Sequence, residues 1–363
     1  MNLFFIGTPL QLLNATEARQ FFEFTDNHLI IALDLNTWPK TKVFARLIRP
    51  QEWASVRYIT LHKTTVNTRP RFLGPFLSTK FENVFYKFHQ YLNKSCLQRL
   101  ARSFPAVDNL VLGNYHADQS RHFPHLVKHN RLYLVDDGTD VLYINEERRN
   151  RPSPAPPAPA APDRRPALRR LRSEFDQSLR WNKQQAESLT FFSAYNLTVR
   201  NGDQAVKNEY HSIRKRIVPA TRHESCLFLG QCLVLDGFLD EDAYVDCLKR
   251  VGAHFQGQEV IYVPHPREAK SIVDRVQQQL GFTIRRFELP VEWQLLSNPV
   301  RPVVLASFFC SALVTCAAIF RDEFKLKAFY IPLGDIQKWP GFVEETYHYF
   351  STQMAPLIEV VGL

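Results

Sequence analysis

The 363-residue sequence contains no run of about 20 consecutive apolar residues, the length that a membrane-crossing helix needs. We therefore expect no transmembrane helix. The stretch from Met1 to Leu10 has neither a basic start nor a small-residue cleavage site, the two signatures of a signal peptide. We expect it to form a first β-strand of a cytoplasmic protein.

Closely spaced cysteine pairs are also lacking. No two of the six cysteines have the Cys-x-x-Cys spacing, which argues against a disulfide framework or zinc site and favours buried thiols in a reducing compartment. Three histidines, His116, His122 and His125, lie close in sequence without a carboxylate at matching spacing, so we expect a solvated loop and no metal. The cysteines are Cys96, Cys226, Cys232, Cys247, Cys310 and Cys316.

Positive charge is concentrated in one segment. The net charge is +9, and residues 148–172 hold eight arginines and one aspartate, which leaves about +2 for the rest. Because no folded face carries the excess, we expect no nucleic-acid partner. Residues 151–166 contain seven prolines without periodicity, so 151–172 is expected to be an extended or mobile insert. A solvated linker is the plainer interpretation; the alternative is peripheral contact of 148–172 with anionic lipid headgroups or an acidic polysaccharide.

Apolar strands alternate with amphipathic helices along most of the chain. This alternation predicts an α/β protein with two Rossmann-like, doubly wound units. In the first half, strands are expected at 3–7, 28–33, 56–60, 109–113 and 131–135, with a further strand region at 191–199. In the second half they are expected at 226–230, 260–263, 282–286, 303–306 and 327–331.

The expected division places a first unit at residues 1–215, a second at 216–345 and a carboxyl-terminal segment at 346–363. Residues 204–216 are expected to form a connecting helix. A last helix is expected at 342–357, with its end packing back across the first unit.

A histidine between two prolines follows one of these strands. The strand from Val260 to Val263 stops at Pro264, and Pro266 denies His265 the α region, so the imidazole is held extended. Ligands of α/β sheets bind at the carboxyl ends of strands. The sequence therefore favours a substrate-facing imidazole, with a plain surface turn as the alternative.

Further polar groups are expected at the same edge. Asp236 follows the strand before His265, and a carboxylate and an imidazole on neighbouring strands can act as general base and general acid. Ser307 and Ser311 flank a helix start, where free N–H groups hold phosphate. The alternatives are an ordinary Asp-Gly turn at Asp236 and a plain helix cap at Ser307.

Taken in order, these motifs resemble those of the bacterial glycosyltransferase family 52 sialyltransferases, which act on lipooligosaccharide. The resemblance covers nearly the whole chain. It rests on Asn2-Leu-Phe-Phe with Thr8-Pro-Leu-Gln11, Val135-Asp-Asp-Gly-Thr139, Pro264-His-Pro-Arg267 and Ser307-Phe-Phe-Cys-Ser-Ala312.

This resemblance implies a GT-B fold with a cleft between its two units, the first serving the acceptor and the second the nucleotide sugar. It implies metal-independent inversion with CMP-sialic acid as donor and no cofactor. The expected location is the cytoplasm, either free or attached peripherally to the inner face of the bacterial inner membrane. A homodimer is compatible with it. The implied catalytic pair is Asp236 as base and His265 as acid. The implied donor-binding residues are Gly230, Pro266, Arg267, Glu288, Ser307 and Ser311, and those implied for the acceptor or a second acid are Thr8, Asp136 and Asp137.

The sequence departs from the family near the proposed base. The family's acid lies in a Gly-Ser-Pro-Asp-like run, whereas Gly230 to Asp236 is longer, which leaves Asp240 as a rival. In the related family 80 the base comes from the Asp-Asp-Gly motif, which leaves Asp136 as another. Cys310 also replaces a small polar residue. Two competing functions remain. One is a glycosyltransferase that uses a different donor, CMP-Kdo or a UDP-hexose. The other is a lipid- or nucleic-acid-binding role of the basic segment.

Overall fold

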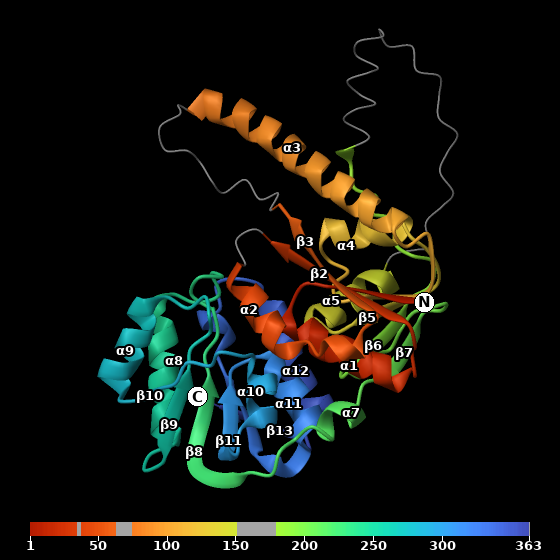
Figure 1. The fold of residues 1–363 in the computed structure, drawn as a ribbon. Helices are drawn as coiled ribbons and strands as arrows, with labels where there is room; N and C mark the ends of the chain where they lie inside the picture. The colour runs from red at the N-terminus through yellow and green to blue at the C-terminus, as the bar shows by residue number, and fades with distance from the viewer. Residues whose placement is uncertain (35–37, 63–74, 151–178, 363) are drawn as a thin grey trace. The chain divides into compact units, whose positions relative to one another are not determined.

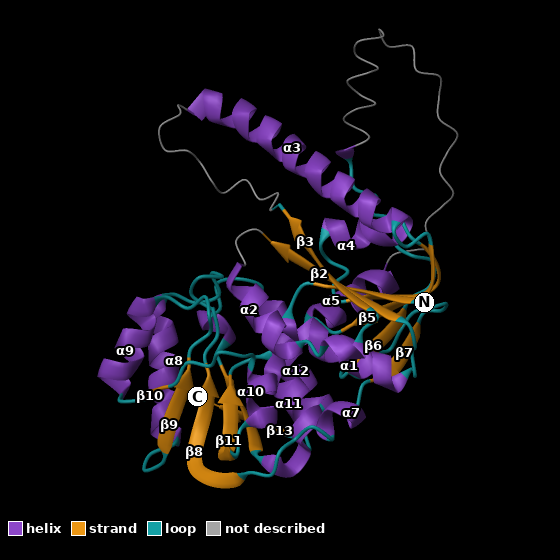
Figure 2. Ribbon diagram, viewed as in Figure 1, coloured by secondary structure: helices purple, strands orange, loops and turns teal. Residues whose placement is uncertain are grey.

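The computed structural model describes residues 1–34, 38–62, 75–150 and 179–362. It forms two compact units, drawn in Figure 1 and coloured by secondary structure in Figure 2. The first comprises Met1–Ser193 and Leu197–Lys207, and the second comprises Ala194–Asn196 and Asn208–Leu363. The insert expected at 151–172 lies outside the described residues.

The first unit contains a seven-stranded, wholly parallel sheet in the order β3-β2-β1-β4-β5-β6-β7. Its order reverses between β1 and β4, and such a switch point leaves a crevice at the carboxyl ends of the two strands. The strands are β1 (Asn2–Ile6), β2 (Asn27–Asp34), β3 (Ser55–Leu61), β4 (Ala106–Leu112), β5 (Lys128–Val135), β6 (Thr190–Ser193) and β7 (Gln204–Lys207). The helices are α1 (Pro9–Phe21), α2 (Trp38–Leu47), α3 (Pro75–Arg102), α4 (Asp118–His122) and α5 (Asp140–Asn150), with 3₁₀ turns at Pro50–Glu52 and Phe123–His125.

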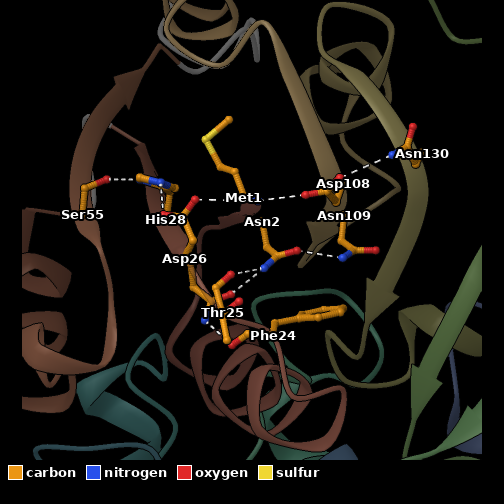
Figure 3. A network of polar contacts seen from close by, with 11 residues as sticks. Met1, Asn2, Phe24, Thr25, Asp26, His28, Ser55, Asp108, Asn109 and Asn130 are labelled. Atoms are coloured by element: carbon orange, nitrogen blue, oxygen red, sulfur yellow. Dashed lines mark hydrogen bonds and ion pairs between the residues drawn. The ribbon is translucent and has the colours of Figure 1, made fainter.

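The amino-terminal edge of this sheet is closed by side chains that bond to one another (Figure 3). Asn109 Nδ2 donates to Asn2 Oδ1 at 2.7 Å, and Asn2 Nδ2 donates to Asn27 Oδ1 at 3.1 Å. The Met1 amine lies 2.8 Å from an Asp108 carboxylate oxygen. These polar groups are therefore largely satisfied within the edge itself, opposite the crevice.

The second unit contains a six-stranded parallel sheet in the order β10-β9-β8-β11-β12-β13, which reverses between β8 and β11. Its strands are β8 (Thr221–Leu229), β9 (Glu259–Val263), β10 (Thr283–Ile284), β11 (Val300–Ser307), β12 (Lys325–Tyr330) and β13 (Ile358–Gly362). Its helices are α7 (His211–Arg214), α8 (Glu241–His254), α9 (Lys270–Leu280), α10 (Val291–Ser297), α11 (Ser311–Phe320) and α12 (Pro340–Gln353), with 3₁₀ turns at Arg321–Glu323 and Leu333–Asp335.

The predicted fold class, α/β with two Rossmann-like, doubly wound units, is confirmed by these two parallel sheets. Two local predictions were wrong. Residues 204–216 are not one helix, because Gln204–Lys207 pairs with β6 as β7. The last helix ends at Gln353 and not at Leu357, and Ile358–Gly362 pairs with β12 as β13.

The start of the basic segment also differs from expectation. Arg148 is fully buried, and its Nε and Nη2 each donate to an Asp203 carboxylate oxygen at 2.7 Å. A buried guanidinium paired in this way presents no charge at the surface. Arg148 therefore cannot take part in the lipid contact expected at 148–172.

Candidate functional site

The His-Pro turn lies where β9 ends in the second unit. The backbone N–H of Arg267 donates to His265 Nδ1 at 3.2 Å. An N–H can only donate, so Nδ1 carries no proton and, in the neutral ring, Nε2 does. Burial lowers the pKa of His265, and the Arg267 charge lowers it further while Asp236 opposes the shift. The imidazole is thus a neutral donor through Nε2–H.

Two buried tyrosines and the half-buried Glu268 hold this turn in place. The backbone N–H of His265 donates to Glu268 Oε2 at 2.9 Å, and the Tyr262 hydroxyl donates to Glu268 Oε1. The Tyr262 and Tyr244 hydroxyl oxygens lie 3.0 Å apart, and Tyr244 accepts the N–H of Gln231 at 3.0 Å. The network joins the segments that follow β8 and β9. Burial raises the pKa of Glu268, and the bonds from Tyr262 and His265 counter that rise.

Asp236 faces Arg267 directly. The Arg267 Nη1 and Nη2 atoms donate to the two carboxylate oxygens of Asp236 at 3.0 and 2.9 Å. The Lys338 Nζ donates to the Asp236 carbonyl at 3.1 Å. Asp236 and His265 therefore do lie on one edge of the molecule, as the sequence predicts. However, a bidentate guanidinium occupies both oxygens that a base would use.

Asp240, the rival acid, caps a helix. Its side chain accepts the N–H of Ala243 at 2.8 Å at the start of α8, and Gln337 Nε2 lies 3.4 Å from its second oxygen. This contact is the ordinary one of an N-cap aspartate.

Two of the predicted donor-binding residues are packed inside the sheet edge. Ser307 is fully buried, and its hydroxyl donates to the Leu229 carbonyl at 2.7 Å, which ties β11 to β8. A Cβ on Gly230 would lie 2.5 Å from the Tyr262 hydroxyl oxygen and 2.8 Å from Glu268 Oε2. Neither position offers a group to a ligand at this edge; both shape the backbone around it.

The remaining predicted donor-binding residues are more open. Ser311 is the first residue of α11 and is partly exposed, as is the capping residue Cys310. Glu288 is exposed in the segment between β10 and α10, and Pro266 shares the exposed turn with Arg267. The first turn of α11 thus follows β11, and the His-Pro turn follows β9, on either side of β8.

In the first unit a pocket of about 350 Å³ opens at the switch point. The Asp137 carboxylate accepts from Asn114 Nδ2 at 2.9 Å and from the Thr8 hydroxyl at 3.3 Å. All three line the pocket, which brings together residues that follow β1, β4 and β5. From the sequence, Asn114 is expected at a strand end, in one of the first-unit loops that would recognise the acceptor. Sequence reasoning missed Gln11 and His62, which also line the pocket.

Asp136 faces the other way. Its residue is 3% exposed, and its carbonyl accepts from Asn14 Nδ2 of α1 at 2.9 Å. Of the two acids in the Asp-Asp-Gly motif, Asp137 is the one that lines the pocket. Alternation of side chains at the end of a strand explains this difference.

Within the described residues, no three His, Cys, Asp or Glu side chains are grouped to hold a metal ion. No described helix is long and apolar enough to span a bilayer.

No protein-family model matches this chain, and no curated protein matches its sequence. Solved structures with a similar architecture include Phytolacca americana UGT2 with UDP-2-fluoro-glucose and pterostilbene (12% identity, 99% of this chain and 85% of that one, TM-score 0.47). Glycyrrhiza uralensis UGT73P12 gives 11% identity, 100% and 81% coverage and a TM-score of 0.49. The UDP-GlcNAc 2-epimerase of Methanocaldococcus jannaschii is 11% identical, with 100% of this chain and 89% of that one covered and a TM-score of 0.47. Likenesses at these TM-scores say nothing about what this chain binds or transforms.

Proposed function

We propose that this chain is a glycosyltransferase, and that it moves sialic acid from CMP-Neu5Ac to a hydroxyl, with galactose of a bacterial surface glycan as the accepting sugar. The observation that carries the proposal is the carboxyl edge of the second sheet. There His265 is fixed as an Nε2–H donor, beside the Arg267 guanidinium and at the same edge as the first turn of α11.

These groups suit a nucleotide phosphate. The N–H groups of a helix start and a guanidinium both bind phosphate oxygens, and a neutral imidazole N–H adds a further donor. The order of the Asp-Asp-Gly-Thr, His-Pro-Arg and Ser-Phe-Phe-Cys-Ser motifs supports CMP-sialic acid as the donor, through the resemblance to family 52.

In the proposed reaction the acceptor oxygen forms a bond to the anomeric carbon while the bond from that carbon to the phosphate oxygen breaks. The electron pair of the broken bond stays on the CMP phosphate, which His265 stabilises through Nε2–H. The phosphate of the bound donor is a diester with one negative charge, and a second charge develops on it as the bond to the sugar breaks. Both charges favour the charged form of the imidazole, so donor binding opposes the lowered pKa of His265. The acceptor's proton passes to a carboxylate.

Asp137 is the carboxylate that we favour for this role. The bidentate partner of Asp236 occupies the oxygens that would accept the proton, and Asp240 is engaged in a helix cap. Asp137 instead lines an open pocket and accepts from neutral donors, an amide and a hydroxyl. Such donors orient a carboxylate without neutralising its charge.

The test is release of CMP from CMP-Neu5Ac with a galactose-terminated acceptor, with CMP-Kdo and a UDP-hexose as competing donors. We expect turnover with CMP-Neu5Ac and less than about one hundredth of that rate with the others, a difference of about 2.7 kcal/mol in activation free energy. Turnover with UDP-hexose alone would leave a glycosyltransferase but reject the donor. No turnover with any donor across varied acceptors would reject the proposal.

A further inference from the structure

Contacts on the inner face of helix α3 in the first unit fix how the helix is rotated about its own axis. Asn93 bonds to both backbone groups of His62, accepting from the N–H at 2.8 Å and donating to the carbonyl at 2.9 Å. Leu97 and Leu100 are buried on the same side. With about 100° between successive residues, these contacts fix which residues point outward.

The outward face carries large apolar side chains. Val84, Phe88 and Tyr91 follow the i, i+4, i+7 spacing of one helix face, and they are 66%, 55% and 53% exposed. In Figure 1 the amino-terminal end of α3 extends beyond the strands of the first sheet. Clustered apolar side chains of this size on a surface mark a binding site.

The same helix is positively charged. Residues 84–102 contain four lysines and arginines and no aspartate or glutamate. Arg99 and Arg102 are exposed and lie on the outward face, about two and three turns after Tyr91. Aromatic residues beside cations on one face are typical of helices that lie in the interface of an anionic bilayer.

We propose that the outward face of α3, residues Val84, Phe88, Tyr91, Arg99 and Arg102, docks on a bilayer that contains anionic phospholipid. The aromatic side chains enter the interfacial region, and the guanidinium groups meet the phosphates of the headgroups. A second copy of this chain is the weaker occupant, because a two-fold pairing would set identical positive faces against each other.

The test is co-sedimentation of the full chain with vesicles of phosphatidylcholine alone and of phosphatidylcholine with phosphatidylglycerol. We expect binding to the anionic vesicles that weakens as salt rises. Phe88→Ser with Tyr91→Ser, and separately Arg99→Glu with Arg102→Glu, should each weaken binding by at least about tenfold. Tyr143→Ser is the matched control, since Tyr143 on α5 is 52% exposed, and it should leave binding within about twofold.

A second measurement does not depend on disruptive substitutions. In Phe88→Trp the added indole should show blue-shifted emission on anionic vesicles and quenching by brominated acyl chains, read as the difference from the native chain. Unchanged binding in both double variants, or no change in emission, would overturn the proposal. So would a loss of self-association in the double variants with vesicle binding intact.

Discussion

Two carboxylates that look alike in sequence have different partners in space. Asp137 accepts from Asn114 and Thr8, whereas both oxygens of Asp236 accept from Arg267. The sequence identified both acids and His265, because each follows an apolar strand. It could not reveal the Asp236–Arg267 pair, because the direction of a side chain in a turn depends on contacts between distant segments.

The residue-scale prediction concerns this pair of acids. Asp137→Asn should lower kcat by about 10²–10⁴-fold, as loss of a general base does, because an amide cannot accept the proton. Asp236→Asn should lower kcat by less than about tenfold, since Asp236 is already bound to a cation. Steady-state kinetics with CMP-Neu5Ac checks both. A dead Asp236→Asn beside a nearly native Asp137→Asn would reverse the assignment.

At the scale of elements, the His-Pro turn depends on residues that carry no motif. Pro264 and Pro266 indicate an extended histidine, but the turn is fixed by Glu268, with Tyr262 and Tyr244 behind it. Tyr262 reads as an ordinary strand residue in sequence. Its role follows from its register in β9, where it lies beside Gly230, the residue that follows β8.

The element-scale prediction uses pH. Glu268 must be ionised to accept both bonds, so the turn loses its support as pH falls through the Glu268 pKa. Tyr262→Phe removes a bond that lowers this pKa, so the acidic limb of kcat/KM should move to higher pH. Glu268→Gln should lower kcat and abolish that limb. Phe228→Leu, on the neighbouring strand with a ring that stacks on Tyr262, is the control for packing.

If the acidic limb of the kcat/KM profile lies at the same pH in Tyr262→Phe as in the native chain, and the rate falls equally at every pH, the network only stabilises the fold. The same conclusion would follow if Glu268→Gln and the packing control behaved alike.

At the scale of the whole molecule, the alternation of strands and helices was enough to predict two parallel sheets. The strand β13 and the short β7 were not predicted. β13 directly follows a helical pattern, and β7 is four residues long, so each depends on an existing sheet edge for its pairing. The insert at 151–172 lies outside the described residues, and the acceptor has no signature in the sequence.

The central claim is that the second unit binds a cytidine nucleotide at His265 and Arg267. Its most direct test is the thermal unfolding of the native chain with CMP and with UDP. At a CMP concentration 100 times its dissociation constant, the free energy of unfolding should increase by about 2.7 kcal/mol, which raises the melting temperature of this unit by about 5–10 °C. UDP should change the melting temperature little. The rise in melting temperature with CMP should vanish in the double variant that combines Arg267→Gln with His265→Ala. A native chain whose melting temperature CMP leaves unchanged, or that CMP and UDP stabilise equally, would contradict the account, and so would a double variant that CMP stabilises as much as the native chain.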